Sequence, residues 1–229
     1  MDTTTVELKS YQTITVDEET GEELVADSFI YLPGRPREYR FNAQNGQFNL
    51  YGERILLDEK GKPVDYFSFQ PISYRFFEDC LFGRTEKEIW AELFFIDKQD
   101  CVSVIMFNNT SVAELIRLME PMHYEKISLL DVVLTVKTEY VRSKKDTSKA
   151  WYIGRFSYNI SPREVARRYR DYVADVPVFR AETINAHADI KVMSRAYAKV
   201  LKNEAHVAYY GIPKAEEVVA IAETASAES

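Results

Sequence analysis

The chain has few of the residues that metal centres and catalytic sites most often use. Its 229 residues include two cysteines, three histidines and eight glycines. His123, His187 and His206 lie far apart and lack cysteine or carboxylate neighbours at ligand spacing, so we expect no metal site. No glycine-rich phosphate loop, nucleophile elbow or recognisable catalytic carboxylate pair is present. We therefore expect a protein that is not an enzyme and binds no cofactor.

Long apolar runs are also missing. No run approaches the roughly 18 residues that a membrane span needs, so we expect no membrane partner. The N-terminus, MDTTTVELKS, has neither an apolar core nor a basic start. These features predict a cytoplasmic protein in which Cys80 and Cys101 are reduced. Buried free thiols are the favoured interpretation, and a disulfide stays open as an alternative.

The formal net charge is −7, which argues against binding nucleic acid over the whole surface but permits a local basic groove. The acidic residues gather near both ends of the chain. Aromatic residues make up 13% of the sequence, mainly as 15 Tyr and 13 Phe. These side chains suit strands, and they also suit surfaces that stack on bases. Packing in a β-rich core accounts for most of them.

The order of the elements expected between residues 66 and 160 is the most specific signal. Ser111 and Glu114 form a capping box that predicts the start of a helix, and Pro121 is expected to end it. Pro71 interrupts the first strand. The elements are strands at 66–77, 88–98 and 101–108, the helix from 111, and strands at 127–141 and 150–160. This order predicts a mainly β fold with C-terminal helices, built on a five-stranded OB-type barrel (β-β-β-α-β-β).

The sequence divides into four parts. Residues 1–64 are expected to be a β-hairpin extension, in which Asn45-Gly46 predicts a tight turn. This extension can add strands to the barrel or form an arm to a neighbouring subunit. The barrel itself takes residues 65–160. C-terminal helices are expected at 161–211, from about 163 to 173 and from about 185 to 209, and a mobile acidic tail at 212–229.

Alternation along the second and third strands places their side chains on two faces. On the second strand we expect Ile89, Ala91, Leu93 and Phe95 inside the barrel, with Trp90, Glu92, Phe94, Ile96 and Lys98 outside. On the third we expect Val102, Val104 and Met106 inside, with Ser103, Ile105 and Phe107 outside. An outer cluster of Trp90, Phe94 and Phe107 is then a candidate platform for bases. If terminal segments cover that face, the same rings are a second core layer.

The segment between the last two strands, 142–149, is rich in lysine and arginine. A flexible cationic loop can follow phosphates, because counterion release favours binding without exact geometry. A solvated hairpin turn has the same composition. Trp151 and Arg155 are expected on the outer face of the fifth strand, where they can contact bases or form a structural pair. Basic residues in the two C-terminal helices indicate a solvated face or an extension of the same path.

The segments EIWAELFFIDK, CVSVIMF, TSVAELIRLM and RSKKDTSK carry a resemblance at the level of architecture. In their order and type the chain resembles the OB-fold single-stranded DNA-binding proteins, including those of phages and mobile elements. The resemblance implies a role in DNA replication or recombination, with replication or recombination proteins as possible partners. The acidic tail of that class recruits partners, but the end of this chain, ETASAES, lacks a terminal Phe.

We therefore expect a non-catalytic single-stranded DNA-binding protein; RNA as a second ligand and a homo-oligomeric state are left open. The expected binding residues are Trp90, Phe94, Lys98, Phe107, Arg142, Lys144, Lys145, Lys149, Trp151 and Arg155. The alternative is a phage-type structural or assembly protein whose barrel and hairpins mediate protein contacts. A third hypothesis, an oligosaccharide-binding barrel, uses the same aromatic residues without needing the basic loop.

Overall fold

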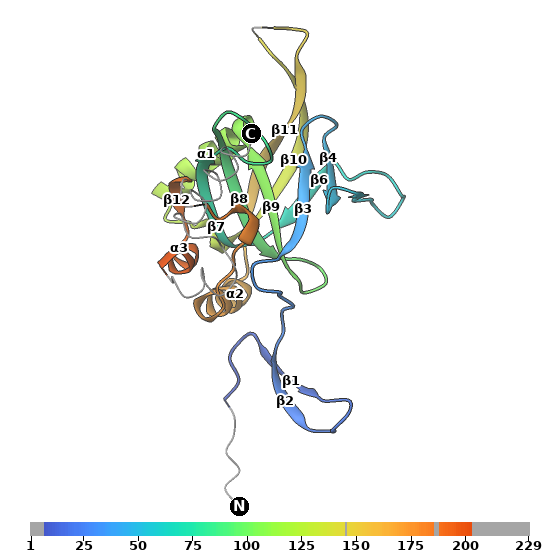
Figure 1. The fold of residues 1–229 in the computed structure, drawn as a ribbon, viewed down its shortest axis with the longest axis vertical. Coiled ribbons are helices and arrows are strands. Elements are labelled where there is room, and N and C mark those ends of the chain that lie inside the picture. The colour runs from blue at the N-terminus through green and yellow to red at the C-terminus, as the bar shows by residue number, and fades with distance from the viewer. Residues whose placement is uncertain (1–6, 145, 186–187, 203–229) are drawn as a thin grey trace, which may run out of the picture.

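The computed structural model describes residues 7–144, 146–185 and 188–202 (Figure 1). The expected acidic tail, Lys145 and the end of the expected second C-terminal helix lie outside these residues. The fold is mainly β. Its strands are β1 Gln12–Val16, β2 Glu23–Asp27, β3 Arg37–Asn42, β4 Gln47–Leu50, β5 Arg54–Ile55, β6 Tyr66–Phe69, β7 Pro71–Asp79, β8 Glu88–Ile96, β9 Val102–Asn108, β10 Val132–Arg142, β11 Ala150–Ile160 and β12 Asp189–Met193. Its helices are α1 Asn109–Tyr124, α2 Arg163–Asp175 and α3 Arg195–Lys202, with 3₁₀ turns at Leu129–Asp131 and Ala181–Thr183.

The strands form three sheets. The largest has the order β12-β7-β8-β9-β3-β4-β5, the second has the order β11-β10-β6, and β1 pairs with β2 alone. The expected break in the first strand is confirmed, because β6 ends at Phe69 and β7 begins at Pro71. The two strands on either side of Gln70 therefore belong to different sheets. β6 pairs with β10 in the three-stranded sheet, and β7 pairs with β8 in the large sheet.

The two larger sheets do not close into a barrel within the described residues. Closure of a five-stranded barrel would require β9 and β11 as neighbours, but β9 pairs in parallel with β3, from Arg37 opposite Ser103 to Arg40 opposite Met106. The turn after β3 contacts β11 through a hydrogen bond from the Tyr152 amide to the Ala43 carbonyl, at 2.7 Å. A strand from the expected N-terminal extension thus occupies the edge of β9.

Two buried clusters lie on opposite faces of the large sheet. The first draws side chains from both larger sheets and from α1: Tyr39, Phe48, Leu50, Phe69, Phe76, Ala91, Leu93, Phe95, Ile105, Phe107, Val112, Leu115, Met122, Leu129, Val132, Leu134 and Val136. The second lies under α2, α3 and the segment between them: Tyr11, Phe29, Ile72, Phe94, Val102, Val104, Tyr172, Val173, Val178, Phe179, Tyr197 and Val200. The C-terminal elements therefore cover part of the outer face.

The helix between β9 and β10 differs from its expected form at both ends. Asn108 precedes the first turn, and the Ser111 hydroxyl accepts a hydrogen bond from the Gly154 amide at 3.0 Å instead of capping the helix. The capping-box interpretation was therefore wrong, because β11 takes up the hydroxyl. Pro121 lies inside the helix, which continues to Tyr124.

The two C-terminal helices were predicted with unequal success. The first is confirmed at Arg163–Asp175. In place of a long second helix, Asp189–Met193 forms β12 on the edge of β7, with Ile190 opposite Phe77. The Ser194 hydroxyl then accepts from the Tyr197 amide at 3.2 Å at the start of α3. Tertiary pairing with β7 therefore outweighs the helical tendency of this segment.

A glycine allows the turn between β3 and β4 to pack closely against the β10–β11 hairpin. Gly46 has φ +72°, and a Cβ placed there would lie 2.5 Å from the Tyr152 ring. We expect Gly46→Ala to lower the free energy of unfolding by at least about 1–2 kcal/mol, the cost of a left-handed Cβ. Gly61→Ala is the control, since Gly61 has φ +73° but no neighbour within 4 Å. Urea denaturation should show the larger loss for Gly46→Ala; equal losses would contradict a steric role for Tyr152.

Candidate nucleic-acid interface

The register of β8 and β9 decides which side chains share the outer face of the large sheet. Phe94 lies opposite Val104, and Trp90 lies opposite Asn108. Val104 is therefore on the outer face with Phe94, whereas Ile105 and Phe107 belong to the core between the sheets. The expected inside and outside faces of β8 are correct. Those of β9 were wrong, because alternation within one strand does not fix its register against the next.

The expected platform of three exposed rings is not formed. Trp90, Phe94 and Phe107 are 5%, 0% and 2% exposed. Phe94 stacks on Tyr197 of α3, with ring centroids 6.0 Å apart, and Phe107 contacts Phe156 of β11. The alternative of a second core layer is therefore correct for Phe94, because α2 and α3 cover its half of the outer face.

The covered half also contains a buried ion pair. Arg75 of β7 and Glu92 of β8 have side chains that are 1% and 0% exposed, and Arg75 Nε donates to Glu92 Oε2 at 2.8 Å. Thr183, in the segment that covers the sheet, accepts from Arg75 through its carbonyl at 2.7 Å and donates to Glu92 Oε1 through its hydroxyl at 2.7 Å. Through Thr183, this ion pair holds the segment that follows α2, residues 176–185, against the large sheet. We call residues 176–185 the covering segment.

The other half of the outer face is an open groove of about 460 Å³. We call it the Phe82 groove. It crosses β3, β4, β8 and β9, and the loop between β7 and β8 forms one wall. Its lining residues are Tyr39, Arg40, Phe41, Asn42, Ala43, Gln44, Asn49, Gly52, Phe82, Arg84, Trp90, Met106, Asn108 and Arg180. The volume lies within the roughly 300–1,000 Å³ typical of ligand sites.

Phe82 supplies an exposed ring at this groove. It is 60% exposed and has φ +56°, a left-handed conformation that is unusual for a bulky residue. Its ring meets Trp90 edge to face at 5.5 Å, and the Arg180 guanidinium lies 5.7 Å from its centroid. The backbone therefore holds an apolar ring in solvent at this groove, and backbone strain of this kind often gathers at ligand-binding sites.

Trp90 forms the fixed part of the same aromatic site. Its indole nitrogen donates to the Asp79 carbonyl at 3.2 Å, which sets the orientation of the ring. The Arg84 guanidinium lies 5.3 Å from the ring centroid, within the range of a cation–π contact. Of the three expected platform rings, Trp90 is therefore the one that lines an open site.

The three arginines of the groove are each paired with carboxylates. Arg40 contacts Glu38 at 2.8 Å, and Arg180 contacts Glu38 at 2.9 Å and Glu182 at 2.6 Å. Because each guanidinium has five N–H donors, pairing leaves donors for a ligand. The groove therefore offers oriented donors with little net charge, an arrangement better suited to a planar polar group than to several phosphates.

Arg84 is paired with Glu88 at the edge of the groove. Partial burial acts to raise the pKa of Glu88, but hydrogen bonds from Asn108 and Arg84 outweigh it and hold the pKa below its ordinary value. Glu88 is therefore ionised at neutral pH and fixes both Asn108 and Arg84.

Two buried polar atoms at the groove have no hydrogen-bond partner among the described residues. They are the amide oxygen of Asn49, which is 7% exposed, and Nε of Arg180, which is 5% exposed. Leaving such groups unpaired costs about 1–3 kcal/mol each. Side chains of Asn42, Gln44 and Asn108 add further amides nearby. The groove therefore has an unpaired acceptor and an unpaired donor buried beneath its surface, and the exposed amide of Gln44 at its rim.

The far end of the β10–β11 hairpin extends beyond the body of the protein (Figure 1). Arg142 and Lys144 are exposed, and the Arg142 guanidinium lies 5.8 Å from the Tyr140 ring. Lys149 pairs loosely with Asp146 at 3.7 Å. Tyr152 in the same hairpin is linked to Ala43, a residue of the Phe82 groove. The hairpin thus joins the groove at the turn between β3 and β4.

Arg155 and Trp151, which were expected to contact nucleic acid, lie against other residues of the chain. Arg155 is held by Glu139 at 2.7 Å and by Glu114. Hydrogen bonds with Glu139 and Glu114 raise its pKa above the ordinary value. Trp151 is half-buried opposite Val141. Arg155 is therefore already bound by two carboxylates of the chain.

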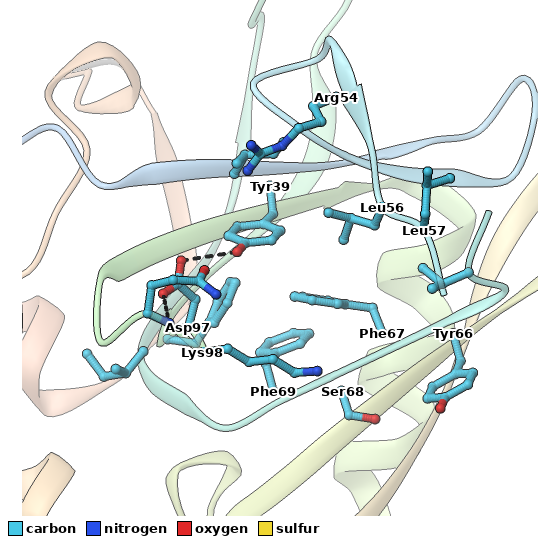
Figure 2. Close-up of a pocket in the computed structure, with 15 residues that line it drawn as sticks. Tyr39, Arg54, Leu56, Leu57, Tyr66, Phe67, Ser68, Phe69, Asp97 and Lys98 are labelled. Atoms are coloured by element: carbon cyan, nitrogen blue, oxygen red, sulfur yellow. Dashed lines mark hydrogen bonds between the residues drawn. The ribbon is translucent and has the colours of Figure 1, made fainter. Parts of the chain in front are cut away.

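Lys98 lies at a different depression, which we call the Phe67 cleft. This cleft has a volume of about 400 Å³ and lies between β5, β6 and the turn after β8. In Figure 2 the rings of Tyr39, Phe67 and Phe69 converge on it, and Arg54 and Lys98 lie at its rim. Apart from Lys145, which is not among the described residues, the expected binding residues are thus distributed over the groove, the hairpin, the cleft and the two cores.

Sequence reasoning missed Phe82, Arg180 and Asn49. Phe82 carried a weak signal as a large apolar residue next to Gly83 in a charged loop. The covering segment brings in Arg180 from far along the chain, which no local pattern indicates. The thiols were also misjudged in part: both are free as expected, but Cys80 is exposed and Cys101 half-buried.

Comparisons with protein-family models, curated proteins and solved structures found no match to this chain. In the part of the chain that the structure describes, no helix is both long enough and apolar enough to cross a bilayer. The Phe82 groove and the hairpin beside it are therefore the features from which a function can be inferred.

Proposed function

We propose that the protein binds single-stranded DNA without catalysis, with bases in the Phe82 groove and phosphates along the β10–β11 hairpin. The order of the elements supports the proposal: β6–β7, β8, β9, α1, β10 and β11 follow one another as in an OB fold, and β6–β7 pairs with both β8 and β10, although β3 takes the place beside β9 that β11 would have in a closed barrel. OB folds bind ligands across their second and third strands. β8 and β9 take those places, and the open half of their outer face is the groove.

The exposed ring of Phe82 is the observation that carries the proposal. Bases stack on aromatic rings whatever their sequence, and each stack contributes about 1–3 kcal/mol. Side-chain amides such as those of Asn42 and Asn49 match the donors and acceptors on base edges. A splayed base can thus use both the ring and the amides of Asn42 and Gln44, whereas the bases of a duplex are stacked and paired with one another.

The hairpin supplies the charge that the groove lacks. Arg142, Lys144 and Lys149 extend from the end of the groove near Ala43, so a strand leaving the groove meets cations. Phosphate contacts of this kind release counterions and make binding depend on salt. The net charge of −7 then restricts binding to this region of the surface.

The proposal is tested by titrating the protein with oligo-dT at low salt while following tryptophan fluorescence. The chain has two tryptophans, one in the groove and one in the hairpin. In a Trp151→Phe variant the signal comes from Trp90, and we expect DNA to quench it. Duplex DNA and RNA of the same length measure the preference. The absence of both quenching and binding for every single strand would overturn the proposal.

Reversing charge on the hairpin should change the salt dependence of binding. We expect Lys144→Glu combined with Lys149→Glu to reduce the slope of log K against log salt by about 1.4, because each phosphate contact on a single strand contributes about 0.7. Lys60→Glu with Lys62→Glu makes the same charge change on an exposed turn elsewhere. If both double variants alter the slope equally, the hairpin has no specific role.

A further inference from the structure

The β1–β2 ribbon, residues 12–27, presents apolar side chains to solvent. Ile14, Val16 and Val25 lie on one face, since Ile14 is opposite Val25 in the register. They are 51%, 61% and 44% exposed. A two-stranded ribbon on its own is marginally stable in water, and a grouped apolar surface of this kind indicates an interaction site.

The body of the protein fixes the ribbon at its base. Tyr11, before β1, and Phe29, after β2, are buried against Tyr172 of α2, with ring centroids 5.4 and 5.0 Å away. The Tyr11 hydroxyl also donates to Asp175 at 2.7 Å. Figure 1 shows the ribbon extending from this anchor away from the rest of the molecule. The fold therefore holds an apolar face outward instead of burying it.

The charge of the ribbon limits the partners that it fits. Its sixteen positions contain Asp17, Glu18, Glu19, Glu22, Glu23 and Asp27 and no lysine or arginine. Hydrogen bonds from Thr20 lower the pKa of Asp17 below its ordinary value, so this carboxylate is ionised at neutral pH. Nucleic acid is excluded by repulsion. A partner must combine an apolar surface with positive charge.

The Phe67 cleft of the same chain has both properties. Its lining includes Leu56, Leu57 and Phe67, and Leu57 is 56% exposed. Arg54 and Lys98 are exposed at its rim and have no ion pair within 4 Å among residues 7–144, 146–185 and 188–202.

The one carboxylate of the cleft lining is already bound within the chain. Asp97 contacts Arg37 at 2.8 Å and accepts hydrogen bonds from Tyr39 at 3.1 Å and Ser103 at 3.0 Å. Burial, followed by the neighbouring Asp97, raises the pKa of Tyr39 above its ordinary value, so the phenol stays protonated and keeps donating. The lining therefore presents Arg54 and Lys98 without a free carboxylate of its own, although Glu53 and Asp58 are exposed next to it in the sequence.

The cleft also lies between two terminal strands; next to β5, Leu56 and Leu57 already pair with Val64 and Pro63, so among the described residues the unpaired edge is that of β6. β5 is the terminal strand of the large sheet and β6 is the terminal strand of the three-stranded sheet. Terminal strands readily accept a further strand from another chain. The ribbon has the shape and the β-structure that such an edge accepts.

We propose that the β1–β2 ribbon of one copy docks in the Phe67 cleft of a second copy. Ile14 and Val16 cover the apolar floor, and the ribbon carboxylates approach Arg54 and Lys98. A contact between two different surfaces of the same chain is heterologous, so it builds a chain of subunits or a ring unless two copies exchange ribbons. This association needs no nucleic acid and does not rest on the DNA-binding proposal.

The test measures the mass of the nucleic-acid-free full chain by light scattering and sedimentation over a range of concentrations. We expect the wild type to self-associate. Ile14→Thr with Val16→Thr keeps β-branched residues in the ribbon but removes apolar area, and we expect the dissociation constant to rise by roughly tenfold or more. Leu32→Thr is the matched control, because Leu32 is 62% exposed outside the ribbon and the cleft.

The second surface is tested by Arg54→Glu with Lys98→Glu, which should also weaken self-association. Each variant keeps one intact surface, so an equimolar mixture of the ribbon and cleft variants should form a 1:1 heterodimer. A wild type that stays monomeric at its highest soluble concentration would overturn the proposal. So would association that both variants leave unchanged, or a mixture that fails to pair. Adding Glu22→Lys and Glu23→Lys to the cleft variant should restore binding if the charges meet.

Discussion

Replacing Phe82 by alanine is expected to weaken the binding of single-stranded DNA by about 1–3 kcal/mol, which is roughly 5- to 150-fold. The ring is exposed and contributes little to the core, so the free energy of unfolding should change little. Tryptophan quenching or anisotropy at fixed low salt gives the affinity. The loss should be similar at every salt concentration, because a stacking contact releases no counterions.

Three further variants isolate the role of the ring. Phe82→Leu retains apolar volume but lacks a π face, so its affinity should resemble that of Phe82→Ala. Phe82→Trp should retain binding. Tyr124→Ala removes a ring that is 86% exposed at the end of α1 and should have no effect. Equal affinities for Phe82→Ala and Tyr124→Ala would show that bases do not stack in the Phe82 groove.

Replacing Arg75 by methionine is expected to lower the free energy of unfolding by about 3–5 kcal/mol. The substitution leaves the Glu92 carboxylate buried with Thr183 but without its cation, and an uncompensated buried charge has a cost of this size. Contacts of the guanidinium with Phe77, at 3.9 Å, and Tyr197, at 5.1 Å, are lost as well. Urea denaturation followed by far-ultraviolet circular dichroism measures the change.

The paired variant separates the ion pair from packing. Arg75→Met with Glu92→Met should recover most of the lost stability, since apolar replacements of buried ion pairs are often neutral. Lys9→Met is the control on an exposed pair: Lys9 contacts Asp175 at 2.9 Å, with side chains 54% and 44% exposed. Exposed pairs contribute about 0–1 kcal/mol. A loss for Arg75→Met no larger than that for Lys9→Met would contradict the role of this ion pair in holding Thr183 and Tyr197 against the sheet.

Much of the fold follows from local patterns. The turn at Asn45-Gly46, the break at Pro71 and the helix after Pro162 could be read because a few neighbouring residues determine each of them. The two faces of β8 could also be assigned, since every second side chain is apolar. Of the two roles predicted for the N-terminal extension, added strands are confirmed for β3, β4 and β5, which join the large sheet, whereas contact of the β1–β2 ribbon with a neighbouring subunit stays a prediction.

The position of the open site could not be read in the same way. Both Phe94 and Trp90 are buried, but Phe94 lies under α2 and α3 whereas Trp90 lines the Phe82 groove, and this difference depends on C-terminal elements far along the chain. Which alternate side chains of β9 face the core between the sheets depends on the register of β9 with β8. No pattern within Val102–Asn108 specifies that register. Glu92 was assigned to the outer face correctly, but its burial required Arg75 and Thr183, which are 17 and 91 residues away.

The parallel pairing of β3 with β9 has a consequence for biosynthesis. The strand Arg37–Asn42 is synthesised well before Val102–Asn108, the strand with which it pairs. This part of the sheet therefore cannot form until about half of the folded body has left the ribosome. Contacts between such distant segments slow folding and leave apolar strands uncovered in the meantime. A fragment that starts at residue 65 lacks β3, β4 and β5, so in it the edge of β9 would stay uncovered permanently.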